Sequence, residues 1–107
     1  EDTITYISEA DFTPTHIAEL NRLATLPVRS ILPAHGAAER IAAGGYDAGL
    51  IAANRSYLMR LLAGEGRDGA PLSRFVADDV EAGRIGYFEP YEAVHRANLK
   101  ALAAVGL

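Results

Sequence analysis

The stretch Ser30-Ile31-Leu32-Pro33-Ala34-His35-Gly36 decides the fold that we predict for this chain. Ile31 and Leu32 favour a buried strand, and Pro33 ends it because proline has no N–H to donate to a neighbouring strand. His35 is the one side chain here that can bind a metal or transfer a proton near neutral pH. Gly36 allows a sharp turn or a close backbone approach. The stretch therefore predicts a short strand with an imidazole at its carboxyl end, where ligands often bind in α/β folds. A Pro/Gly loop with an incidental histidine is the alternative.

The flanking sequence predicts one more strand and several helices. Residues 3–7 are dense in β-branched and aromatic side chains and predict an outer strand with an exposed edge. Helices are expected at residues 14–26, 37–43, 48–63, 71–82 and 90–105, from their apolar spacing and from the Pro and Gly residues at their ends. The predicted fold class is therefore α+β and mainly helical, with one or two short N-terminal strands and four to five helices.

Length, charge and composition exclude several classes of protein. The 107 residues suit one small domain, and a net charge of −4 argues against a general nucleic-acid binder, which needs a basic surface. The chain has no cysteine, so disulfides and thiolate metal sites are excluded. It also has no apolar run of about 18 residues. We therefore expect neither a nucleic-acid partner nor a membrane partner.

Two motifs in the first 65 residues resemble the C-terminal end of the metallo-β-lactamase fold hydrolases. In that family a turn of the form Leu/Val-Pro-Gly-His-Gly supplies the last metal-binding histidine, and Leu32–Gly36 matches it except at Ala34. A helix with an Asn/Arg-x-Tyr-Leu-x-x-Leu pattern is also familiar from the family, and Asn54–Leu58 matches it. The family's main metal signature, H-x-H-x-D-H, is absent, because the only histidines are His16, His35 and His95.

The resemblance implies that the chain is a C-terminal fragment of a zinc-dependent hydrolase. Residues 1–65 would be the end of an αββα metallo-β-lactamase domain, and residues 66–107, which follow a Gly-rich linker, a helical extension packed on it. The intact parent would hold a pair of zinc or other divalent ions, with His35 as one ligand, Gly36 letting the turn pack closely and Asn54 supporting the turn. We expect no catalytic residue and no bound metal in this chain alone. Its first partner would be the missing N-terminal part of its own fold.

Two further expectations concern association and the last helix. Apolar side chains that the missing sheets would have covered, among them Ile4, Ile7 and the stripe from Leu50 to Leu62, predict a homo-oligomer. His95 and Asn98 lie one helical turn apart and would be core residues, or would line a pocket or a dimer seam. The rival hypothesis for the whole chain is a self-contained helical interaction or oligomerisation domain, in which the Leu32–Gly36 stretch is only a turn.

Overall fold

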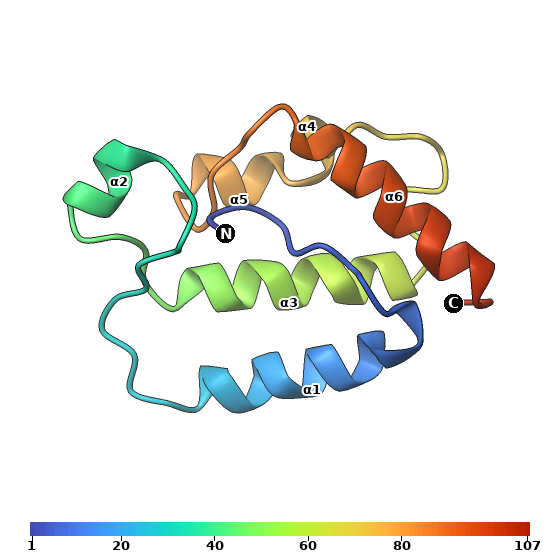
Figure 1. The fold of residues 1–107 in the computed structure, drawn as a ribbon, viewed down its shortest axis with the longest axis horizontal. Coiled ribbons are helices and arrows are strands. Elements are labelled where there is room, and N and C mark those ends of the chain that lie inside the picture. Colours follow the sequence, from blue (N-terminus) through green and yellow to red (C-terminus); the bar gives the residue numbers. More distant parts are fainter.

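The computed structural model describes residues 1–107 and contains helices but no β-sheet (Figure 1). In chain order the elements are η1 (Ala10–Phe12), α1 (Thr13–Ala24), α2 (Ala38–Ala42), α3 (Gly49–Leu62), α4 (Leu72–Phe75), α5 (Ala77–Glu81) and α6 (Tyr91–Ala104). No helix has both the length and the apolar character required to cross a lipid bilayer.

The long helix α3 lies at the centre of the molecule. Helix α1 packs along one side of it, and the shorter α4 and α5 lie with α6 on the other side (Figure 1). Ala48 and not the predicted Asp47 occupies the N-cap of α3, but Oδ1 of Asp47 accepts a hydrogen bond of 2.7 Å from the N–H of Gly49, one of the N–H groups that a helix start leaves unpaired. The N-terminal segment passes between α3 and α6 (Figure 1).

One hydrophobic core joins both halves of the chain. Its buried members come from the N-terminal segment, α3, α4 and α6 and from the connections between helices: Ile4, Ile7, Tyr46, Leu50, Ala53, Tyr57, Leu58, Leu61, Leu72, Phe75, Val76, Ile85 and Leu102. The apolar stripe of α3 is therefore covered within the chain by the N-terminal segment and by residues of α4 and α6. Ile4, Ile7 and most of the stripe are buried, so the predicted reason for oligomerisation does not hold for them.

The predicted α+β class is wrong, because neither predicted strand forms. Residues 1–9 contain no strand, and Ile31 makes only an isolated antiparallel bridge with Tyr46, with N···O distances of 2.6 and 2.8 Å. A strand needs a neighbouring backbone, and here side chains replace it: the backbone of Thr3, Thr5 and Ile7 is bonded by asparagine amides from α3 and α6.

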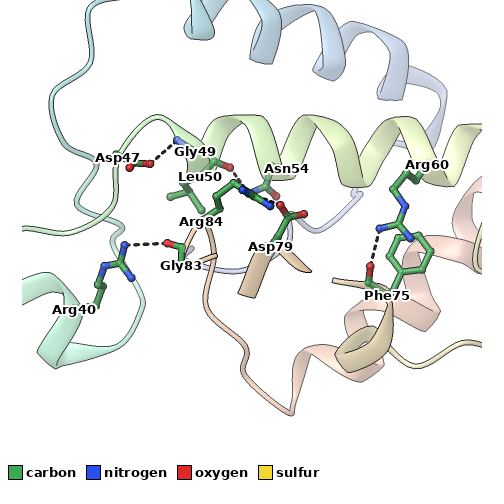
Figure 2. A network of polar contacts seen from close by, with 10 residues as sticks. All are labelled: Arg40, Asp47, Gly49, Leu50, Asn54, Arg60, Phe75, Asp79, Gly83 and Arg84. Carbon is green, nitrogen blue, oxygen red and sulfur yellow. Dashed lines mark hydrogen bonds and ion pairs between the residues drawn. The ribbon is translucent and has the colours of Figure 1, made fainter. Parts of the chain in front are cut away.

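The predicted helix at residues 71–82 is divided into α4 and α5 at Val76. In a continuous helix the carbonyl of Phe75 would accept a hydrogen bond from the N–H of Asp79. It instead accepts one of 2.6 Å from Nη1 of Arg60, and the guanidinium of Arg60 lies 3.9 Å from the centre of the Phe75 ring (Figure 2). Val76 leaves helical geometry, with φ −110° and ψ 15°, and is buried. An arginine from α3 therefore stabilises the break.

Two further arginines, Arg40 and Arg84, connect the segment after α5 to α2 and to α5. Arg40 of α2 donates through Nη2 to the carbonyl of Gly83 at 3.0 Å, and Arg84 pairs with Asp79 at 2.5 Å (Figure 2). Arg40 also donates through Nε to the carbonyl of Gly45 at 2.8 Å. The Arg40 bond to Gly83 holds the segment after α5 against α2, and residues 86–88 of that segment lie beside the turn that carries His35.

Candidate functional site

His35 lies on an exposed turn that follows Ile31 in the chain and precedes α2. Its side chain is 80% exposed, and Nδ1 lies 3.3 Å from Oε1 of Glu1. The predicted place of this imidazole at the carboxyl end of a buried strand is wrong, because no strand precedes it. The imidazole is nevertheless exposed, so it can bind a ligand or contact another part of a protein.

The turn is held in place by Asp2, a residue that the sequence did not single out. Asp2 is only 8% exposed, and its Oδ2 accepts hydrogen bonds from the N–H of Ala37 at 2.9 Å and from the hydroxyl of Tyr46 at 2.8 Å. The backbone carbonyl of Asp2 accepts a further bond of 2.6 Å from the N–H of Gly86. A buried carboxylate with this many donors fixes the backbone directly after His35.

Gly36 permits this approach of the carboxylate. A Cβ atom at position 36 would lie 2.7 Å from Cγ of Asp2, far inside normal contact. The predicted close packing at Gly36 therefore has a specific partner in the structure.

The hydroxyl of Tyr46 is buried beside the Asp2 carboxylate. Burial, followed by the hydrogen bond to Asp2 and the negative charge of Asp2, raises the pKa of Tyr46 to about 12, although Arg40 opposes the shift. The Arg40 guanidinium lies 4.1 Å from the centre of the Tyr46 ring. Tyr46 is therefore a neutral hydrogen-bond donor at any physiological pH.

Asn54 does not contact the turn that it was predicted to support. Its Oδ1 accepts from the N–H of Thr5 at 2.8 Å, and its Nδ2 donates to the carbonyls of Thr3 at 3.2 Å and Leu50 at 3.1 Å. Asn54 is thus hydrogen-bonded to the N-terminal segment, and Asp2 of that segment is hydrogen-bonded to Ala37 after the turn. The influence of Asn54 on His35 is therefore indirect.

A cavity of about 740 Å³ opens beside His35. His35 and Gly36 form one part of its wall, and Glu1 and Asp2 form another. Three aromatic side chains from the segment before α6 and from its first turn also line it: Tyr87, Phe88 and Tyr91. This volume lies within the range of small-molecule sites in proteins.

His35 is the only histidine at the cavity. His16 lies on α1, and His95 is buried in α6. The structure contains no group of three or more His, Cys, Asp or Glu side chains that could hold a metal ion together. A catalytic zinc site takes about three protein ligands, so His35 and Glu1 do not make one by themselves.

His95 and Asn98 are buried core residues. This was the first of the alternatives predicted for the pair. Tyr57 Oη lies 2.8 Å from Nδ1 of His95 and accepts a bond of 3.1 Å from Nδ2 of Asn98. Burial lowers the pKa of His95, and the nearby Ala70 backbone and Glu92 carboxylate offset only part of this effect. Burial also raises the pKa of the Tyr57 hydroxyl. Burial thus favours the uncharged forms of both side chains, and the network is part of the core.

No family model, no curated protein and no solved structure matches this chain. Its function must therefore be inferred from the residues and from the geometry around His35.

Proposed function

We propose that this chain is the C-terminal piece of a metal-dependent hydrolase of the metallo-β-lactamase superfamily, and that it supplies the metal ligand His35. In that superfamily a pair of zinc or other divalent ions lowers the pKa of bound water and polarises the bond to be hydrolysed. The resemblance of Leu32–Gly36 and Asn54–Leu58 to the family's motifs is the sequence basis. The α+β architecture that the resemblance implied is not part of the proposal.

The observation that carries the proposal is the support of an exposed imidazole by a buried carboxylate. Asp2 accepts a hydrogen bond from the N–H of Ala37, and Gly36 leaves room for Asp2, so the backbone on the carboxyl side of His35 is tied to a buried side chain. Burying a carboxylate is costly unless it is hydrogen-bonded, and here the donors come from Ala37, directly after the turn, and from Tyr46. Such support is what a metal-ligating side chain requires.

The position of Glu1 indicates which imidazole nitrogen would face a metal. Metal-bound histidines usually donate their second ring N–H to a carboxylate or a carbonyl, which fixes the tautomer and the orientation of the ring. In this chain the Glu1 carboxylate lies beside Nδ1, at 3.3 Å. Glu1 would hold the proton on Nδ1 and leave the lone pair of Nε2 free for the metal.

The residues of this chain do not complete a zinc site. One imidazole is available where about three protein ligands are needed. The remaining ligands would come from the missing N-terminal part of the same fold, and the chain alone would neither hold zinc tightly nor hydrolyse a substrate. We assign no catalytic residue to it.

A self-contained helical interaction domain is the second candidate, and the single closed core favours it. The apolar face of α3 is covered by the N-terminal segment, α4 and α6, so no large core surface is left for a missing sheet to cover. In this reading the Leu32–Gly36 turn has a structural role only.

The coding sequence upstream of Glu1 distinguishes the two candidates. The hydrolase proposal predicts an H-x-H-x-D-H pattern in the same reading frame, followed by further sequence leading to Glu1. A start codon a few residues before Glu1 would contradict it and would support the interaction domain.

A further inference from the structure

The cavity beside His35 combines aromatic walls with acidic side chains. Tyr87, Phe88 and Tyr91 line it, together with the carboxylate residues Glu1 and Asp2. None of its ten lining residues is a lysine or an arginine. We propose that this cavity binds a small organic cation of the quaternary ammonium class, with the cationic head against the aromatic rings and carboxylates.

The aromatic rings are available for such contacts. The side chain of Phe88 is 58% exposed, and its ring centre lies 6.1 Å from that of Tyr91, with an angle of 46° between the ring planes. Tyr87 is also exposed, and its hydroxyl is fixed by a hydrogen bond of 2.5 Å to Oε2 of Glu92. Phe88 and Tyr87 thus offer partly exposed ring surface at the cavity, and aromatic rings recognise quaternary ammonium groups through their negative faces.

The carboxylates add charge complementarity. Both hydrogen bonds that the Asp2 side chain accepts go to Oδ2, which leaves Oδ1 of this buried residue without a donor. Glu1 lies at the rim, beside His35. Burial and the nearby Glu1 and Asp2 carboxylates raise the pKa of the Tyr91 hydroxyl, so both carboxylates lie close to this wall of the cavity. Two carboxylates among the lining residues favour a cationic ligand over an anionic one.

The size of the cavity restricts the ligand further. About 740 Å³ lies in the range of small-molecule sites and accommodates a trimethylammonium head with an attached ring. Binding of such a cation requires no metal ion and no second part of the protein, so it is independent of the hydrolase assignment.

The test compares two ring compounds of opposite charge. Benzyltrimethylammonium and benzoate would be titrated into the 107-residue chain at about pH 8, with the N-terminus acetylated so that no α-amino group competes for the carboxylates. We expect saturable binding of benzyltrimethylammonium with a Kd of about 1 mM or tighter, and at least about tenfold weaker binding of benzoate. NMR signals of the Tyr87, Phe88 and Tyr91 rings should shift with the cation.

Two pairs of variants locate the site. Phe88→Ala should weaken binding of the cation by about fivefold or more, whereas Phe12→Ala, which removes an equally exposed ring outside the cavity, should leave it unchanged. Glu1→Gln should weaken it by about threefold, and Glu19→Gln on α1 should not. Equal binding of benzoate, an equal loss in Phe12→Ala, or no saturation by about 10 mM cation would overturn the proposal.

Discussion

The side-chain amides of Asn54 and Asn98 bind the same edge of the N-terminal segment, two residues apart. Asn54 pairs with the N–H of Thr5 and the carbonyl of Thr3, and Asn98 pairs with the N–H of Ile7 at 2.8 Å and the carbonyl of Thr5 at 2.9 Å. Each amide thus makes the two bonds that a neighbouring strand would make. The two asparagines replace a strand with one side chain from α3 and one from α6.

Replacing Asn98 should be strongly destabilising. Asn98→Ala leaves the N–H of Ile7 and the carbonyl of Thr5 without their partner and removes a donor to Tyr57, all at a fully buried position. We expect a loss of about 2 to 3 kcal/mol in the free energy of unfolding, measured by urea denaturation.

Two matched variants serve as its controls. Asn54→Ala should cost less, because Asn54 is only half-buried and water can reach the groups that it leaves. Asn21→Ala, on the exposed face of α1, should change the free energy of unfolding by about 0.5 kcal/mol at most. Similar values for Asn98→Ala and Asn21→Ala would contradict the strand-like role of the amide.

Adding a methyl group at position 36 should disturb the turn through Asp2. The new Cβ of Gly36→Ala would lie 2.7 Å from Cγ of Asp2, so the carboxylate must move away from Ala37 and Tyr46. We expect a loss of about 1 to 3 kcal/mol in unfolding free energy.

A double-mutant cycle identifies the cause of that loss. In an Asp2→Ala background the carboxyl group that the new methyl would meet is gone, and only the Cβ of residue 2 remains, at 3.0 Å. The cost of Gly36→Ala should therefore fall by about 1 kcal/mol or more. Additive effects of the two substitutions would show that the cost has another origin.

The buried His95 should make the chain less stable in mild acid. Its pKa is lowered in the folded state, so the unfolded chain binds this proton first as the pH falls below about 6.5. The stability contributed by neutral His95 is fully present above that pH and is lost progressively below it, down to the folded pKa. Urea midpoints at about pH 7.5 and about pH 5.5 measure the effect.

The pH dependence should belong to His95 and not to His16. His95→Gln should lower stability at neutral pH but flatten its decrease between these two pH values, whereas His16→Gln should leave the decrease unchanged. A wild-type decrease that persists in His95→Gln would refute the assignment.

Self-association remains a prediction, but it now rests on a smaller surface than the one expected from the sequence. Tyr6 is 60% exposed, and its backbone groups make no hydrogen bond within the chain, which leaves this point of the N-terminal segment open to a second copy. Sedimentation at micromolar concentration should show a species larger than the 11.4 kDa monomer. Tyr6→Lys should shift it towards monomer, and Leu26→Lys should not. A monomer at all concentrations would exclude this role for the N-terminal segment.

The helices were predictable because their signals are local. Pro14 at the start of α1, Asp47 before α3 and the apolar spacing of α3 each act within a few residues. The strands were not predictable in the same way. Residues 3–7 have strand composition, but their partners are two asparagines 49 and 91 residues away along the chain. Only the tertiary structure shows that the backbone of this segment is hydrogen-bonded by side-chain amides and not by a neighbouring strand.

The site was predictable only in part, for the same reason. His35 and Gly36 were identified from the sequence, and the structure puts both beside one cavity. Asp2 was missed because its donors, Ala37 and Tyr46, lie 35 and 44 residues away. Likewise, no residue near Phe75 in the sequence indicates that Arg60 donates a hydrogen bond to the Phe75 carbonyl. This bond lies at the break between α4 and α5.

The most direct test of the hydrolase proposal is the substitution His35→Ala in the intact parent enzyme, with metal content and turnover measured together. The proposal predicts that turnover falls by about 100-fold or more and that metal content drops, while circular dichroism shows an unchanged fold. His16→Ala, on α1 and away from the cavity, should retain both activity and metal. Unchanged turnover and unchanged metal content in His35→Ala would contradict the proposal and would make the Leu32–Gly36 turn a structural feature only.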